Sequence, residues 1–216
     1  MSRNRNRLIE DLAADLRPTP RPGRVVPWTA AWLLVVTGAT LLVTALVQPF
    51  RAGALGQLVA EPRFMVESLA GVAAIVALTI GAFKSAIPDP GRARRWTIAT
   101  LLLLAVWLSF YLVGLVSPAL EPTMSGKRDD WCRWETLVYG CVALGAGLLL
   151  LRRLWPLHGA RSGLLIGLAA GMIQALTMQF ACMYVPSHIL THHVLPGLLV
   201  GVAGLLIGRW WLKPRL

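Results

Sequence analysis

The chain has 216 residues, of which 56% are apolar and 14% are charged, whereas about 25% of residues are charged in a typical soluble domain. Charged side chains are missing from residues 25–50, 96–120 and 162–208. Apolar runs longer than about 18 residues indicate membrane spans, which excludes a soluble globular domain. The net charge of +11 is then explained by basic residues that collect in cytoplasmic loops. The chain has no basic stripe interleaved with aromatic residues, so nucleic-acid binding is not expected.

Residues 1–26 predict a cytoplasmic arm without a cleavable signal peptide, because the basic start is followed by an amphipathic segment. Apolar residues recur there at helical spacing. They are Leu8, Ile9, Leu12, Ala13 and Leu16. Three prolines between residues 18 and 22 end this helix and form a stiff tether. A helix of about ten residues is too short to be stable alone, so it needs the bilayer, its own loops or, as we expect, a protein partner.

The remaining residues, 27–216, predict an all-α polytopic membrane domain, a bundle of six transmembrane helices. The uncharged block 162–208 has room for two spans, with a break at residues 184–188. The expected spans are about 27–49, 64–83, 96–117, 131–151, 162–183 and 192–212.

The distribution of basic residues predicts the orientation of the six spans. With the N-terminus inside, inner segments hold 16 of the 21 Lys and Arg residues and outer segments hold 5. Because basic residues collect in cytoplasmic loops, both termini are expected in the cytoplasm.

Glycines recur at four-residue spacing in the last two spans, in a pattern that allows membrane helices to approach closely. They are Gly163, Gly167, Gly171, Gly197, Gly201, Gly204 and Gly208. The pattern favours packing within one bundle, and a homodimer interface is the alternative.

Two cysteines are expected at the outer surface, Cys132 where span four begins and Cys182 where span five ends. In an oxidising compartment they could form a disulfide if their Cα atoms lie within about 7 Å. As thiolates they could instead bind a soft metal ion. Cys141 lies nine residues after Cys132, on the opposite helix face, and is interpreted as an apolar filler.

Histidines in the expected outer loop extend this set of metal ligands. His188, His192 and His193 follow Cys182, and a set of cysteines and histidines suits zinc-like ions. The candidate metal ligands are Cys132, Cys182, His188 and His192. No other cofactor is expected. The chain has no nucleophile elbow, phosphate-binding loop, dinucleotide fingerprint or zinc-protease motif, so we expect no enzyme.

The stretch from Leu8 to Pro18, together with the six spans and the cysteines at the outer ends of spans four and five, resembles the NrsF-like family, negative regulators of sigma F. The resemblance implies an anti-sigma factor of the bacterial inner membrane that holds an extracytoplasmic-function (ECF) sigma factor on the cytoplasmic side. It also implies that Leu8, Leu12 and Leu16 belong to the sigma-contacting helix, and that Cys132 and Cys182 sense heavy metal or oxidative stress.

Two other functions remain as alternatives to a stress-sensing regulator. A membrane thiol-disulfide oxidoreductase would use Cys132 and Cys182 for exchange, although the chain has no CxxC motif. A small metal or solute transporter would not need residues 1–20.

Overall fold

The computed structural model is all-helical, and no strand occurs among the residues that it describes. These are residues 7, 9–11, 13–14, 25–47, 50–86, 90–121, 131–154, 156 and 158–212. The elements in chain order are α2 (Val25–Val47), α3 (Ala54–Ala60), α4 (Pro62–Ser85), α5 (Pro90–Gly114), α6 (Trp131–Arg152), α7 (Gly159–Ala181), α8 (Pro186–Ile189), the π-helix η1 (Leu190–Val194) and α9 (Leu195–Trp211).

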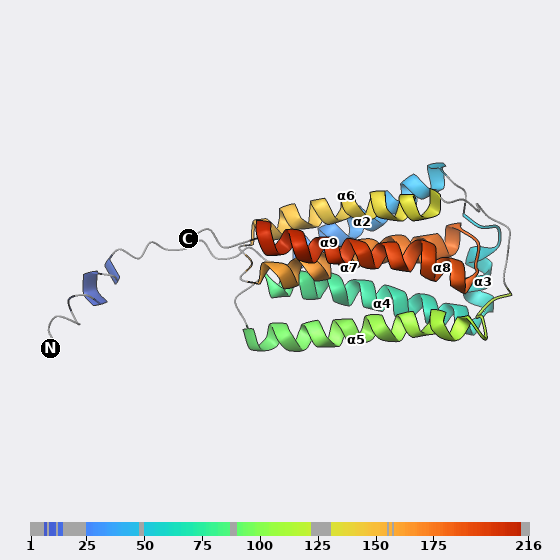
Figure 1. Ribbon diagram of the computed structural model, residues 1–216, viewed down its shortest axis with the longest axis horizontal. Coiled ribbons are helices and arrows are strands. Elements are labelled where there is room, and N and C mark those ends of the chain that lie inside the picture. The colour runs from blue at the N-terminus through green and yellow to red at the C-terminus, as the bar shows by residue number, and fades with distance from the viewer. Residues whose placement is uncertain are drawn as a thin grey trace.

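Six helical segments are long and apolar enough to cross a membrane, which makes the chain a multi-pass membrane protein. They are α2, α4, α5 from Arg94, α6, α7 and the continuous segment Pro186–Trp211. Figure 1 shows them side by side in one bundle, with the start of α2 and the end of α9 at one end. We call this the terminal end, and the opposite end, where α6 begins and α7 finishes, the cysteine end.

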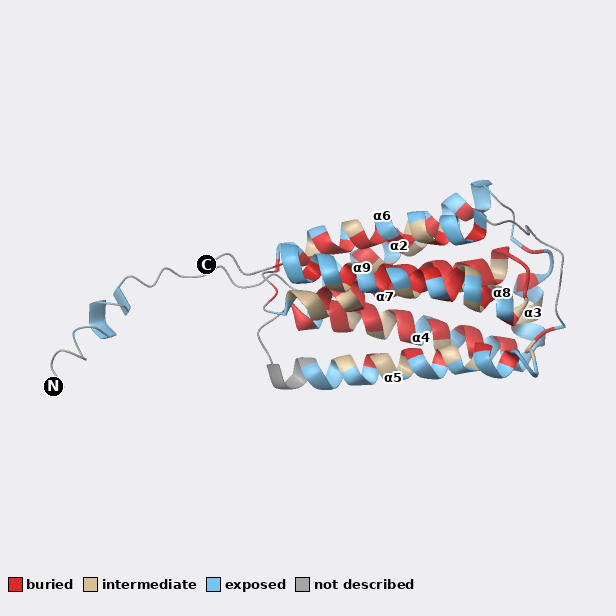
Figure 2. Ribbon diagram, in the orientation of Figure 1, coloured by how far each residue is buried: buried red, intermediate tan, exposed pale blue. Residues whose placement is uncertain are grey.

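Helix α7 lies at the centre of the bundle, where it packs against α9 through their backbones. In the most apolar stretch of α7, 83% of the residues are buried, against 22% in the corresponding stretch of α2 (Figure 2). Glycines face each other along the first half of α7 and most of the antiparallel α9, from Gly159 opposite Gly208 to Gly171 opposite Gly197. Side chains at these positions would overlap the opposing backbone, so the glycine stripe serves packing within one chain.

The outer helices present apolar side chains to their surroundings, as the exposed colouring of α5 and α6 in Figure 2 shows. Helix α2 buries only one narrow stripe. Its members are Thr29, Trp32, Val36, Thr40 and Thr44. Hydrocarbon chains can cover the remaining apolar surface, as expected for a helix at the edge of a membrane bundle.

Basic side chains cover tryptophan rings near the terminal end. The Lys84 ammonium lies 4.0 Å from the centroid of the Trp96 ring, and the Arg152 guanidinium lies 4.8 Å from that of Trp211. Tryptophan and long basic side chains both favour the membrane–water boundary, because each combines an apolar body with a polar tip. These pairs join α4 to α5 and α6 to α9.

Two features of the helix pattern differ from the expectations. Helix α3 was not anticipated, since it is a short segment between two spans. The last helical segment starts at Pro186 rather than near residue 192, after an extended link at residues 182–185. The histidines therefore lie on helical backbone, and their placement in an outer loop was wrong. Proline at the first helical position has no N–H to leave unpaired, which explains why the helix can start there.

The expected N-terminal arm is described only in part. Ile9 is helical and 56% exposed, which leaves an apolar side chain uncovered. Leu8, Leu12, Leu16 and the proline tether lie outside the described residues.

The α7–α9 contact predicts that Gly163→Ala destabilises the protein. A Cβ at residue 163 would overlap the carbonyl oxygen of Gly204, which is backbone and cannot rotate away. Overpacking costs typically about 1–3 kcal/mol, and this exceeds the gain of about 1 kcal/mol from replacing a helical glycine. We expect a lower melting temperature in detergent.

Gly145→Ala is the matched control, because a Cβ at residue 145 meets nothing within 4 Å. It should leave the melting temperature unchanged or raise it slightly. Equal effects of the two substitutions would contradict the backbone contact.

Candidate functional site

The thiols of Cys132 and Cys182 lie together at the cysteine end, although they are 50 residues apart in the chain. Their Sγ atoms are 3.7 Å apart, and both residues are fully buried. Met178, Ala181 and Met183 pack around them in a small apolar cluster that is separate from the main core. Cys141, by contrast, is exposed on α6 and is not part of this cluster.

Each thiol is positioned by the end of a membrane helix. Cys132 is the second residue of α6, and its carbonyl oxygen accepts a hydrogen bond from the Thr136 hydroxyl at 3.1 Å. Cys182 caps the C-terminus of α7 in an extended conformation, and its N–H still donates to the carbonyl oxygen of Met178. The chain turns away from the α7 axis at this residue, which directs its side chain toward α6.

Two histidines complete a cluster with the thiols. His188 Nε2 lies 3.4 Å from Cys182 Sγ, and the donor atoms of Cys132, Cys182, His188 and His193 all lie within 4.8 Å of one another. From the sequence, His192 was expected as the second histidine ligand. The structure instead stacks His192 on His188, with ring centroids 4.2 Å apart, and its Nδ1 lies 2.7 Å from the Thr191 hydroxyl.

The buried imidazole of His193 is oriented by α6. Its Nδ1 lies 3.0 Å from the Thr136 hydroxyl, which already donates its hydrogen to the carbonyl oxygen of Cys132. The hydroxyl can then only accept, so Nδ1 carries the ring proton and Nε2 presents a lone pair. Nε2 is buried and makes no hydrogen bond among the described residues.

The environment of Cys182 keeps its thiol protonated. Its hydrogen bond with Cys132 raises the pKa of the Cys182 thiol, and burial raises it further. A disulfide would require the Sγ atoms to approach from 3.7 Å to about 2.05 Å. A metal ion would have to displace the protons, since the thiolate is the ligand. The arrangement is suited to either reaction.

A buried polar network lies next to the thiols and ties the link 182–185 to α4. The Tyr184 hydroxyl donates to Glu67 Oε2 at 3.0 Å, deep enough that Glu67 is only 2% exposed. The neighbouring Gln179 bonds Ser68 through its Nε2, at 3.0 Å, and accepts a hydrogen bond from the Tyr111 hydroxyl. These contacts fix the backbone on both sides of Cys182.

The loop before α3 closes over the same region. The backbone N–H of Arg51 donates to the carbonyl oxygen of Phe180 at 2.9 Å, and its guanidinium donates to Gln57 Oε1 at 2.6 Å. Burial lowers the pKa of Arg51, and its guanidinium lies 5.9 Å from the centroid of the Tyr184 ring. This loop therefore covers the end of α7 and the link that follows it.

Sequence reasoning missed three of these residues. His193 was left out of the expected metal ligands, which included His188 and His192, four residues apart in the expected loop. Thr136 gave no signal, since threonine is common in membrane helices. Glu67 was visible as a charge in an apolar run, and such residues are ordinarily functional or paired.

The Tyr184–Glu67 hydrogen bond predicts that Tyr184→Phe destabilises the cysteine end. Removing the hydroxyl leaves a buried carboxyl oxygen without its donor, which costs about 1–3 kcal/mol. Thermal unfolding in detergent measures this loss. Tyr139→Phe removes the same hydroxyl from the surface groove between α2 and α6 and should change stability by less than about 0.5 kcal/mol. Equal losses would contradict the role of the bond.

No curated protein and no solved structure matches the chain. A protein-family model described as negative regulator of sigma F matches residues 12–213, which is nearly the whole chain and includes all six spans. The description is that of a negative regulator of a sigma factor. The chain therefore belongs to the NrsF family, the negative regulators of sigma F, and is a membrane-spanning anti-sigma factor.

Proposed function

We propose that this protein holds an ECF sigma factor at the bacterial inner membrane through its N-terminal helix and releases it when Cys132 and Cys182 sense heavy metal or oxidative stress. Both termini lie in the cytoplasm in this proposal, and the cysteine end faces the periplasm. The observation that carries it is the buried thiol pair, with Sγ atoms 3.7 Å apart, at the end of the bundle opposite the start of α2. The proposal thus requires a signal that crosses the membrane.

Helix α6 offers the route for this signal, because it carries Cys132 at its second residue and contacts α2. The indole N–H of Trp32 on α2 donates to the carbonyl oxygen of Ala143 at 3.3 Å. The same indole nitrogen lies 3.1 Å from the position where a Cβ of Gly147 would stand. Because α2 begins at Val25, directly after the arm, a shift of α6 would be passed to the arm through Trp32.

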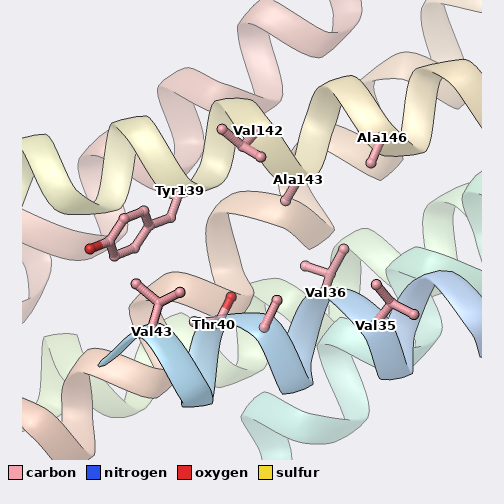
Figure 3. Close-up of a pocket in the computed structure, with 9 residues that line it drawn as sticks. Val35, Val36, Thr40, Val43, Tyr139, Val142, Ala143 and Ala146 are labelled. Carbon is pink, nitrogen blue, oxygen red and sulfur yellow. The ribbon is translucent and has the colours of Figure 1, made fainter. Parts of the chain in front are cut away.

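Helix α2 is the least buried of the six spans and is flanked by apolar grooves. Figure 3 shows the groove between α2 and α6, with Val36, Thr40 and Val43 facing Tyr139 and Val142 across it. A second groove separates α2 from α4 and α7. On the α7 side, Gln174 Nε2 donates to the Thr40 hydroxyl at 2.9 Å. Few contacts hold α2, so moving it costs less than moving α7 or α9.

The free energy that the signal supplies limits how strongly the resting state can favour the bound sigma factor. Turning a mostly bound sigma factor into a mostly free one takes about 5.5 kcal/mol of differential free energy. A disulfide typically contributes about 2–4 kcal/mol. The resting equilibrium must therefore lie within a few kcal/mol of release, which a loosely packed helix such as α2 allows.

The sigma-factor partner is tested by pull-down of cytosolic proteins with the tagged protein in mild detergent. We expect a sigma factor with the full-length chain and none with a variant lacking residues 1–20, because the arm carries the binding helix. A sigma-dependent reporter should lose its response to metal or oxidant in the Cys132→Ser, Cys182→Ser double variant. The absence of a cytosolic partner would overturn the proposal and favour thiol exchange or transport, and a normal response of the double variant would refute the sensing role.

The α6–α2 route predicts that Trp32→Phe reduces induction of the reporter while pull-down of the sigma factor persists. The substitution keeps an aromatic ring but removes the hydrogen bond to Ala143. Trp28→Phe is the matched control on the same helix, since the Trp28 ring is partly exposed and faces the guanidinium of Arg153 at 6.0 Å. Normal induction in Trp32→Phe would show that the signal takes another route.

A further inference from the structure

We propose that Cys132, Cys182, His188 and His193 form a four-coordinate site for a zinc-like divalent metal ion, with His193 rather than His192 as the second imidazole. The inference rests on the proposed function only for its biological meaning, because metal binding can be measured without a sigma factor. It names the ligand set and the ion class, which a sensing thiol pair alone leaves open.

The distances between donor atoms match a tetrahedral site. With Zn–S near 2.3 Å and Zn–N near 2.0–2.1 Å, tetrahedral geometry separates two sulfurs by about 3.8 Å and a sulfur from a nitrogen by about 3.6 Å. The Cys132 and Cys182 sulfurs are 3.7 Å apart, and Cys182 Sγ is 3.4 Å from His188 Nε2. The remaining donor atoms lie within 4.8 Å, so small side-chain rotations bring all four to one ion.

The imidazole of His193 is already oriented for metal coordination. Its Nδ1–H is held by the Thr136 hydroxyl, and its buried Nε2 has no hydrogen-bond partner among the described residues. An unpaired buried nitrogen costs free energy, and metal coordination would satisfy it. A second group that binds the far nitrogen of a ligating histidine is the usual way in which proteins fix its tautomer and direction.

The π-helix η1 explains why His193, rather than His192, joins the donor set. In an α-helix, residues five apart point about 140° away from each other. The wider turn at residues 190–194 brings the residue five positions after His188 back toward the same side, and the two rings are 5.3 Å apart. Single π turns are uncommon and occur frequently at functional sites. The extra residue in this turn is therefore what completes the donor set.

The donor set selects the class of ion. Two thiolates and two imidazoles in a tetrahedron suit Zn²⁺ and similar soft or borderline divalent ions, whereas Mg²⁺ and Ca²⁺ prefer oxygen ligands. Two thiolates also neutralise a divalent charge, which matters because Cys132, Cys182 and His193 are all buried. The ion would join α6 to the end of α7 and the α8–η1 segment.

The test is titration of the reduced, full-length protein in detergent with Co²⁺, followed by displacement with Zn²⁺. We expect one Co²⁺ per chain, the visible absorption of tetrahedral Co²⁺, and a thiolate charge-transfer band that is lost in Cys132→Ser. His188→Ala and His193→Ala should each weaken binding by at least about 100-fold, and Thr136→Val by about 10–100-fold, as for other groups that orient a ligand.

His192→Ala is the matched control, because this neighbouring histidine stacks on His188 without joining the donor set. It should bind Co²⁺ as the unaltered protein does. His188 is only half-buried, so His188→Ala tests the site even if His193→Ala does not fold. Octahedral Co²⁺ spectra, no binding by the reduced protein, or unchanged affinity in His188→Ala would overturn the proposal.

The two proposals fail in different ways. A protein that recovers a sigma factor but binds no Co²⁺ leaves the proposed function intact and removes the metal site. A protein that binds Co²⁺ with the expected spectrum but recovers no sigma factor keeps the site and overturns the proposed function.

Discussion

The backbone contact between α7 and α9 is the constraint on which the rest of the structure depends. In a membrane, helices gain little from apolar burial against each other, so close approach through glycines supplies the packing. Opposing glycines meet from Gly159 and Gly208 at the terminal end to Gly171, in the middle of α7, and Gly197. The two helices form a rigid hairpin, and residues 182–185 close it at the cysteine end.

This hairpin supplies three of the four clustered side chains. Cys182 ends α7, while His188 and His193 lie on the segment that leads into α9. Only Cys132 comes from a separate helix, α6, and it meets the hairpin at its own first turn. Any bond formed between Cys132 and the other three therefore changes the position of α6 against a fixed reference. That asymmetry supports the proposed switch, in which α6 moves relative to the α7–α9 hairpin.

Burying polar side chains inside a membrane costs free energy, yet several surround the link between α7 and α8. Glu67 and Tyr184 pair, and Gln179 bonds both Ser68 and Tyr111. Each of these bonds ties the hairpin to α4 or α5. Because a buried polar group without a partner is costly, this network favours one arrangement of the link. The thiol of Cys182 is thereby held in place on its α7 side, while α2, with few such bonds, stays free to shift.

The sequence by itself determined the fold class, because apolar length and the spacing of charges decide how many helices cross a membrane. It also placed Cys132 and Cys182 at the same end, since the order of spans gives the end of each helix. The glycine stripe was readable for the same reason: a four-residue repeat marks one helix face.

Only the tertiary structure shows that His193, and not His192, lies in the cluster with the thiols. Periodicity assumes a regular α-helix, and the π turn at residues 190–194 changes which side chains share a face. The partners of Thr136 and Glu67 likewise lie 57 and 117 residues away in the chain, on helices whose rotation no local pattern records. The number and direction of the helices follow from local composition, but the atoms that meet at the site depend on how each helix is rotated against its neighbours.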